Sequence, residues 1–302
     1  MIYNSILDLI GHTPLVRINK ITESEDAEIL VKLEKLNVGG SVKDRLGLYL
    51  IMDAEKKYPD IKDRTIIEAT SGSTGIALSM IGAMKGYKIT IVMPAGVSEE
   101  RRKIIKAYGA ELILSPADQG TGGSIALKKE MIAKNPEKYI AVDQHENPAN
   151  IAAHFETTAE EIWQDTEGRI DMVVIAVGTA GTGIGISRKL KAYNPEIKII
   201  GVTPRLGASI QGLRNPREAN GSKLFDEKYF DEMIELSSDE IPLTYEFSRR
   251  LAREEGILAG MSAGAAMYVA VCKAKELGKG KRIVTLLADS GERYLSTELF
   301  GG

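Results

Sequence analysis

Short runs of β-branched and aliphatic residues alternate along the chain with longer segments whose apolar residues recur at helical spacing. Such runs, bounded by turn residues, are typical of buried strands, and their alternation with helices is typical of parallel sheets. We expect strands at 28–35, 65–69, 88–93 and 110–115 in the first half of the chain, and at 171–177, 197–202 and 282–288 in the second. The pattern therefore predicts an α/β fold in which helices connect the strands of mostly parallel sheets.

A polar, turn-rich segment at 143–153 separates the two series of strands. A chain of 302 residues is long for one hydrophobic core and suits two. We therefore expect an N-terminal α/β domain at 1–145 and a C-terminal α/β domain at 146–302. The sequence has no internal repeat and no low-complexity tract, and we expect no regulatory domain after the second domain.

Composition and charge argue against several classes of protein. The formal net charge is -3 and no basic run occurs, so we expect no binding of nucleic acid or of an anionic membrane. The longest apolar runs, such as 172–177, are far shorter than the roughly 20 residues that span a bilayer. The amino end lacks the basic and apolar regions of a signal peptide. These features predict a cytoplasmic protein that acts on small molecules.

Cysteine and histidine are rare in this chain. Cys272 is the only cysteine, so no internal disulfide is possible, and we expect its side chain to be a small buried apolar group on a helix. The three histidines have no H-E-x-x-H motif and no cysteine pair beside them. We therefore expect no metal site.

Two glycine-bearing loops each follow a predicted strand and precede a predicted helix. One is "TSGSTG" at 70–75, and the other is "GTAGTG" at 178–183. Such loops direct backbone N–H groups and hydroxyls at a point in front of a helix N-terminus, which is an anion site. A helix cap alone also selects serine, threonine and glycine. The second loop is followed by Ile184 where a Walker loop has lysine, and it has Ile186 at the third glycine of a dinucleotide fingerprint. The pattern favours a phosphate ligand other than ATP or NAD.

Two further residues stand at predicted helix starts. Ser262 opens the helix in "GMSAGAAMYVAV", where it can serve simply as a cap. Lys43 stands just inside a helix N-terminus, behind two glycines and a serine. A protonated lysine in that position costs about 0.3–1 kcal/mol. Either Lys43 is an ordinary solvated lysine that tolerates this cost, or its neutral form is the functional one.

These stretches together resemble the fold-type II pyridoxal-phosphate enzymes, and among them the cysteine synthase (O-acetylserine sulfhydrylase) and cystathionine β-synthase group. The matching stretches run from "IGHTPLVRI" through "GGSVKDR", "TSGSTGIAL", "QHENPANIAAHFETTAEEIW", "GTAGTGIGIS" and "GMSAGAA" to "DSGERYLSTELF". The resemblance implies two three-layer αβα domains with mostly parallel twisted sheets, and pyridoxal 5'-phosphate bound in the cleft between them. It also suggests a homodimer and, in some relatives, docking of a serine acetyltransferase tail.

The resemblance implies a role for each matching residue. Lys43 matches the Schiff-base lysine, whose neutral amine is favoured by a helix N-terminus and a dry pocket and then serves as general base. The loop that binds the cofactor phosphate is matched by Gly178, Thr179, Ala180, Gly181 and Thr182, and the loop that binds the substrate carboxylate by Thr70, Ser71, Gly72 and Thr74, with Gln144 beside it. Ser262 matches the serine that faces the pyridine nitrogen.

Two departures from the family pattern stand out. Ser73 replaces an asparagine that reaches the cofactor's 3′-oxygen, and the shorter serine bears on the tilt of the cofactor and on the reaction outcome. Ala180 replaces a glycine, so we expect its backbone to stay in the ordinary region of dihedral space.

The resemblance implies a β-replacement reaction that forms L-cysteine from O-acetylserine, or O-phosphoserine, and sulfide through an aminoacrylate intermediate. One alternative is a cysteine lyase or desulfhydrase that releases sulfide from L-cysteine, with water or a thiol as nucleophile. Another is cystathionine β-synthase activity with homocysteine. A third, of a different class, is a phosphate-binding protein without catalysis in which Lys43 is only a helix lysine.

The segment 205–232 is expected to select the substrate. Gln211 and Gly212 match a cysteine synthase active-site loop, but the residues after them do not. Arg214 either binds a phosphate leaving group or forms an ion pair with Glu218, four residues on. Asp231 belongs to an acidic group that either deprotonates water or is a solvated surface.

Overall fold

The chain divides into two units in a computed structural model that describes residues 2–218 and 221–301. The first unit contains residues 2–10 and 37–150, and the second contains 11–36 and 151–301. The chain passes from the first unit to the second inside helix α5 (Ala149–Ala153). The predicted polar boundary segment contains this crossing. The predicted domain 1–145 was wrong for residues 11–36, which belong to the second unit.

The first unit contains a parallel sheet. Among its described residues the sheet has four strands in the order β5-β4-β3-β6. The strands are β3 (Thr65–Ala69), β4 (Lys88–Pro94), β5 (Glu111–Ser115) and β6 (Tyr139–Ala141), and the helices are α1 (Lys43–Lys57), α2 (Ser73–Lys85), α3 (Glu99–Ala107) and α4 (Gly120–Lys134). Strand β3 is buried along its whole length, as expected for a central parallel strand covered on both faces.

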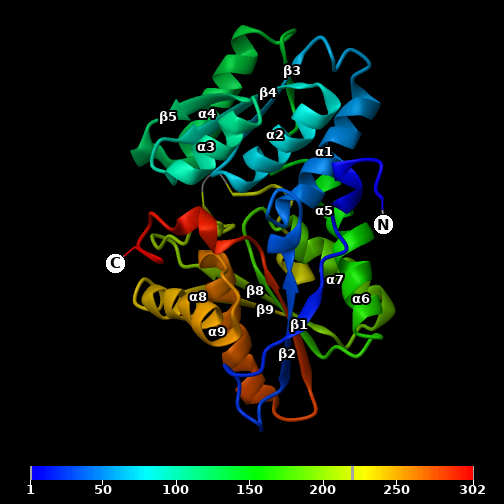
Figure 1. The fold of residues 1–302 in the computed structure, drawn as a ribbon, viewed down its shortest axis with the longest axis vertical. Coiled ribbons are helices and arrows are strands. Elements are labelled where there is room, and N and C mark those ends of the chain that lie inside the picture. The colour runs from blue at the N-terminus through cyan, green and yellow to red at the C-terminus, as the bar shows by residue number, and fades with distance from the viewer. Residues whose placement is uncertain (1, 219–220, 302) are drawn as a thin grey trace. The chain divides into compact units, whose positions relative to one another are not determined.

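Helices cover both faces of this sheet (Figure 1). Alternate residues of a strand point to opposite faces, and β3 shows this directly. Ile66 packs in one core cluster with Leu50 of α1 and Ile76 of α2. Its neighbour Ile67 belongs to a second cluster, against which Met131 of α4 packs. The first unit therefore has the predicted three layers.

The second unit contains the larger sheet. Its described residues form six strands in the order β1-β2-β10-β7-β8-β9, of which only the β1–β2 pair is antiparallel. The strands are β1 (Leu15–Arg17), β2 (Glu28–Leu33), β7 (Met172–Ala176), β8 (Lys198–Pro204), β9 (Glu232–Leu236) and β10 (Arg282–Leu287), and the helices are α6 (Ala159–Asp165), α7 (Gly181–Tyr193), α8 (Ile241–Glu255) and α9 (Met261–Leu277). Figure 1 shows α8 and α9 on one side of this sheet and α6 and α7 on the other.

The pairing of β2 explains why residues 11–36 join the second unit. Strand β2 pairs in parallel with β10 from Glu28 opposite Arg282 to Leu33 opposite Leu287. The side chain of Ile29 is buried in the core of the second unit. A hydrophobic run predicts a strand but does not specify its partner, which here lies at the other end of the chain.

The predicted strands are all present, within a residue or two at each end. Strands β1, β6 and β9 were not predicted; β1 and β6 are too short to show a period. Cys272 lies on helix α9 as predicted, but its side chain is exposed, so the expectation of a buried side chain was wrong. In the part of the chain that the structure describes, no helix is long and apolar enough to cross a membrane.

Candidate active site

The loop that joins β3 to α2 leads into a helix start of the kind that suits an anion, in the first unit. Helix α2 begins at Ser73, and the N–H of Ile76 donates to the carbonyl oxygen of Gly72 at 2.9 Å. The amides of Thr74 and Gly75 precede that first helical bond, so no bond within the helix uses them. The hydroxyl of Thr70 accepts the N–H of Gly72 at 3.0 Å and holds the turn.

Gly72 is required at this turn for two reasons. Its φ of 140° is one that residues with a side chain rarely adopt. An added Cβ would lie 2.5 Å from Cδ of Arg101. The Arg101 side chain comes from α3, is 2% exposed, and donates from a guanidinium nitrogen to the carbonyl oxygen of Ser71 at 3.2 Å. The loop therefore rests directly on a buried guanidinium group.

Gln144 lies against the same loop, as the sequence predicted. Its Nε2 donates to the carbonyl oxygen of Ala69 at 3.0 Å, and its Oε1 accepts the hydroxyl of Thr74 at 2.7 Å. The amide of Asn150 in turn donates to the carbonyl oxygen of Gln144 at 2.8 Å. A side-chain amide has two N–H donors, so Gln144 retains one for a ligand at the loop.

Lys43 and Ser73 stand at the starts of two parallel helices that pack together. Helix α1 begins at Lys43, which confirms the predicted position. The two helices run in the same direction, because Gly47 of α1 lies against Ala77 of α2 and, farther along both helices, Glu55 pairs with Lys85 at 2.8 Å. They approach closely where a Cβ on Gly47 would lie 3.0 Å from Cβ of Ala77. Lys43 and Ser73 each lie one turn before that contact, so Lys43 and loop 70–74 are at the same level along the two helices.

The second glycine-bearing loop forms another helix start, in the second unit. Residues 178–182 join β7 to α7, and the N–H of Ile184 donates to the carbonyl oxygen of Ala180 at 3.0 Å. The preceding amides are those that a 13-residue helix presents to an anion. This loop has the form expected for binding a phosphate group.

The residues around this loop form a close cradle. A Cβ on Gly178 would lie 2.9 Å from the carbonyl oxygen of Gly212, and a Cβ on Gly212 would lie 3.4 Å from Oγ of Ser262. Ser262 is the second residue of α9 and is buried. The structure therefore brings together three predicted site segments that are far apart in sequence, and the glycines leave space that side chains would fill.

Ala180 differs from the expectation. Its φ is 68°, which is in the left-handed region that a side chain disfavours by about 1–2 kcal/mol. The expected ordinary backbone was therefore wrong. Ala180 is the N-cap residue of α7 and holds this left-handed conformation although it has a side chain.

His154 is a residue that the sequence analysis missed. Its ring is fully buried, with Nε2 3.1 Å from the hydroxyl oxygen of Thr182 and Nδ1 2.9 Å from that of Thr158. It begins a π-helical turn (His154–Thr158), a feature often found at functional sites. A Cβ on Gly185 would lie 2.8 Å from Cβ of His154, so a glycine allows this contact. No local pattern marks a histidine as the support of a loop 28 residues away.

The structure shows one of the two interactions that were predicted for Arg214. Its Nε lies 2.9 Å from a carboxylate oxygen of Glu218, so the ion-pair alternative is present. Its backbone N–H donates to the carbonyl oxygen of Val177 at 3.0 Å, which keeps the segment beside the phosphate-type loop. Residues 219–220 of the predicted specificity segment lie outside the described residues.

Asp231 does not lie near these loops. It precedes β9, and its carboxylate accepts from the ammonium of Lys191 at 2.9 Å and from the N–H of Ile199 at 2.8 Å. Ile199 is near the amino end of β8, whereas loop 178–182 follows the carboxyl end of the neighbouring parallel strand β7. The prediction that Asp231 influences specificity was wrong, because the acidic run enters the sheet at its other end.

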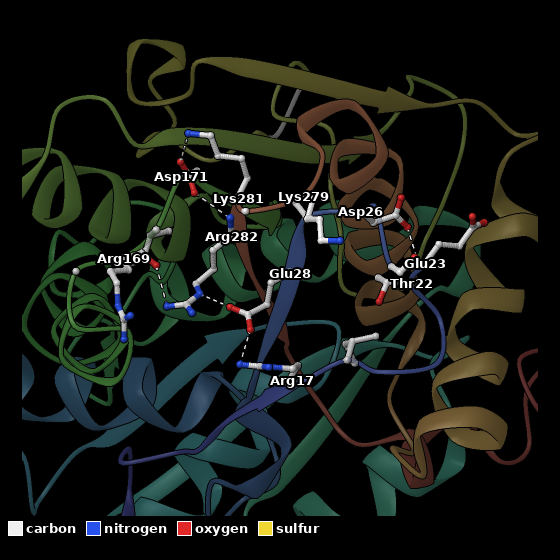
Figure 2. Close-up of a pocket in the computed structure, with 16 residues that line it drawn as sticks. Arg17, Thr22, Glu23, Asp26, Glu28, Arg169, Asp171, Lys279, Lys281 and Arg282 are labelled. Atoms are coloured by element: carbon white, nitrogen blue, oxygen red, sulfur yellow. Dashed lines mark hydrogen bonds and ion pairs between the residues drawn. The ribbon is translucent and has the colours of Figure 1, made fainter.

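A charged pocket of about 780 Å³ also lies at the amino ends of β2, β7 and β10, away from loop 178–182 (Figure 2). Its charges compensate one another. Glu28 pairs with both Arg17 and Arg282, and Asp171 accepts from Lys281 at 2.8 Å. Ligands of parallel α/β sheets bind at the carboxyl ends of the strands, so this pocket is not the candidate active site. Among residues 2–218 and 221–301 no group of His, Cys, Asp and Glu side chains is arranged to hold a metal ion.

Comparison with known proteins agrees with this arrangement. Residues 6–289 match the family model described as "Pyridoxal-phosphate dependent enzyme". A cysteine synthase of Aquifex aeolicus (strain VF5) is 46% identical over 303 residues, which cover 98% of this chain and 92% of that protein. The crystal structure of a cysteine synthase from Entamoeba histolytica is 41% identical, with a TM-score of 0.88, over 99% of this chain and 91% of that one. A hydrogen sulfide-producing enzyme from Fusobacterium nucleatum is 40% identical, with a TM-score of 0.90, over 97% of this chain and 100% of that one. The sequence motifs, the two helix-start loops and these similarities together show that the chain belongs to the pyridoxal-phosphate dependent enzyme family.

Proposed function

We propose that this enzyme forms L-cysteine by replacing the β-substituent of O-acetylserine, or of O-phosphoserine, with sulfide. The observation that carries the proposal is that Lys43, at the start of α1, lies at the same height as loop 70–74, at the start of the adjacent helix α2. Both belong to the first unit. That arrangement suits a substrate with an α-carboxylate and an acidic Cα–H. The cysteine synthases with which the chain shares nearly its whole length support the same reaction.

The residues present fit pyridoxal 5'-phosphate. The amides and hydroxyls of loop 178–182 would hold its phosphate, and the hydroxyl of Ser262 would face its pyridine nitrogen. Bound pyridoxal phosphate supplies a carbonyl that condenses with amines and an electron sink for cleavage of bonds at Cα. A neutral hydroxyl at the ring nitrogen favours β-elimination over transamination, because it does not keep that nitrogen protonated.

Each predicted site residue of the first unit has a distinct role in this proposal. Lys43 would hold the cofactor through its amine and, once free, accept the proton from the substrate Cα. The N-terminus of α1 favours the neutral amine that both tasks require. The amides at the start of α2, with the remaining N–H of Gln144, would bind the α-carboxylate and aim the Cα–H at Lys43. Ser73 would stand beside the cofactor ring, where its shorter side chain affects the tilt.

The assignment of Lys43 is tested by spectroscopy and peptide mapping. The purified protein should show a visible absorption band that borohydride abolishes, and the reduced cofactor should be recovered on the peptide that contains Lys43. Lys43→Ala should lose turnover by several orders of magnitude. The matched control is Lys56→Ala, an exposed lysine on the same helix, which should keep full activity. Retained turnover in Lys43→Ala contradicts the assignment.

The reaction itself is tested by offering substrates one at a time and identifying the products. We expect O-acetylserine or O-phosphoserine with sulfide to give L-cysteine. A second candidate function is release of sulfide from L-cysteine, which the similarity to the Fusobacterium nucleatum enzyme favours. If only L-cysteine is consumed, with sulfide as product, the second candidate is correct and the first is not. Homocysteine in the same panel tests cystathionine formation.

We further propose that the enzyme is a cytoplasmic homodimer, as the family resemblance suggests. Light scattering of the purified protein measures its mass directly. Docking of a serine acetyltransferase is tested by adding a peptide with that enzyme's carboxyl-terminal sequence and measuring inhibition.

A further inference from the structure

A buried ion pair lies beneath the loop that binds the substrate carboxylate. Glu68 is the fourth residue of β3, two residues before Thr70, and Lys128 is on α4. The Lys128 Nζ lies 3.1 Å from Oε1 of Glu68, and the two side chains are 5% and 1% exposed. Lys128 also donates to the carboxylate of Asp143 at 2.6 Å. The pair therefore connects the end of β3 with the segment that carries Gln144.

Glu68 makes two further bonds, both to the backbone. Its Oε1 accepts the N–H of Ala69 at 2.7 Å, and its Oε2 accepts the N–H of Gln144 at 3.1 Å. Ala69 immediately precedes the carboxylate loop, and Gln144 accepts the hydroxyl of Thr74 inside that loop. One buried carboxylate thus holds both segments that determine where the loop and the Gln144 amide meet.

The conformation of the chain before Gln144 depends on the same contacts. Asp143 has a φ of 49°, in the left-handed region that few residues with a side chain adopt, although aspartate does so more often than most. Lys128 binds the side chain of Asp143, and Glu68 binds the next N–H. The left-handed turn at Asp143 is therefore held from both sides.

Stability alone does not account for this pair. A buried ion pair is often no more stabilising than apolar residues of the same volume, but apolar residues cannot accept two backbone N–H groups. Burial raises the pKa of Glu68, although Lys128 opposes that effect. Burial lowers the pKa of Lys128, but the facing carboxylates of Glu68 and Asp143 outweigh this and raise it overall. Glu68 accepts hydrogen bonds from the N–H groups of Ala69 and Gln144 and from Nζ of Lys128. Because an ionised carboxylate only accepts hydrogen bonds, these contacts favour ionised Glu68 beside protonated Lys128.

We propose that Glu68, paired with Lys128, is a positioning residue that fixes the Gln144 amide against the carboxylate loop and thereby sets the enzyme's affinity for the substrate α-carboxylate. This inference rests on the proposed function, because it takes the loop to be the carboxylate site. Glu68 acts through Ala69 and Gln144 and does not itself touch the substrate.

The test compares Glu68→Gln, Lys128→Met and the double variant with the wild-type holoenzyme. The matched control is Ser124→Ala, which lies one turn before Lys128 on α4 and removes a buried hydrogen bond of 2.7 Å to Ser115 without touching the loop. Binding of L-serine and of ethanolamine, which lacks the carboxylate, is titrated through the cofactor absorption. Unfolding in urea is measured on the same samples, and so is cofactor uptake by the apoenzyme.

We expect both single variants to weaken L-serine binding by about 10- to 100-fold, which is the effect of losing a hydrogen bond to a buried charge. Ethanolamine binding and cofactor uptake should stay within about 2-fold of wild type. In the double variant the stability should recover because no buried charge is left unpaired, whereas L-serine binding should stay weak because the carboxylate is absent.

Three outcomes overturn the inference. The first is L-serine affinity that follows stability across the variants, including recovery in the double variant. The second is an equal loss for ethanolamine, and the third is an equal loss in Ser124→Ala. Failure of the proposed function gives a different result, since the wild type would then bind L-serine no better than ethanolamine or would form no cysteine from any tested substrate.

Discussion

The turn at Gly72 gives a sharp test of how the carboxylate loop is built. We consider Gly72→Ala beside Gly86→Ala, because both glycines flank the same helix α2 and both have positive φ, 140° and 74°. The two sites differ in their surroundings. A Cβ at Gly72 would lie 2.5 Å from Cδ of Arg101, whereas a Cβ at Gly86 would meet no atom within 4 Å.

The structure sets the expected size of each effect. At Gly72 the backbone conformation should cost alanine about 1–3 kcal/mol, and forcing a methyl group against the buried Arg101 should cost about 1–3 kcal/mol more. Alanine also restricts the unfolded chain, which offsets about 0.4–1 kcal/mol. We therefore expect Gly72→Ala to lower the free energy of unfolding by about 2–5 kcal/mol. Gly86→Ala should lower it by about 1.6 kcal/mol at most.

The assay is urea unfolding of the holoenzyme, with L-serine titration on the same samples. A double variant, Gly72→Ala with Arg101→Ala, removes the atom that the new methyl group would meet, so its loss should be smaller than the sum of the two single losses. L-serine binding should weaken at Gly72 and stay unchanged at Gly86. Equal unfolding midpoints for the two single variants, or additive losses in the double variant, would refute the reasoning.

Three further predictions follow from the second unit. Ala180→Gly should not lower the free energy of unfolding, because φ at this position is 68°, whereas the same change inside a helix typically lowers it by about 1 kcal/mol. A loss of that size in urea unfolding would contradict the inference that the Ala180 backbone is strained. His154→Phe should weaken cofactor binding by the apoenzyme about 10-fold, since the ring contacts the hydroxyl of Thr182; unchanged fluorescence titration argues against that support. Burial raises the pKa of Asp231, but hydrogen bonds from Lys191 and a backbone amide lower it overall, so its stabilisation is present above the ordinary carboxylate pKa and is lost as pH falls through the lowered one. Asp231→Asn should therefore reduce unfolding free energy by about 1–2 kcal/mol at pH 7 and have little effect near pH 2–3; an equal loss at both pH values contradicts this sign.

Much of the candidate site could be predicted from the sequence, because its parts depend on short stretches of chain. Strands such as β3 follow from continuous runs of β-branched residues, and helix starts follow from glycine and hydroxyl residues after those runs. The position of Lys43 at a helix start is equally local. Roles within the site came from the family resemblance, which spacing alone does not supply.

The tertiary structure alone decided which of these parts meet. Strand β2 pairs with β10 from the far end of the chain, and Asp231 enters its sheet at the end opposite loop 178–182. Glu68 meets Lys128 sixty residues away, and His154 supports Thr182 through a π-helical turn. Periodicity and turn chemistry act over a few residues, whereas strand order and the partners of buried charges are chosen by packing of the whole unit. The sequence by itself therefore determined the elements and the loops that bear the chemistry, and the three-dimensional packing determined what holds those loops in place.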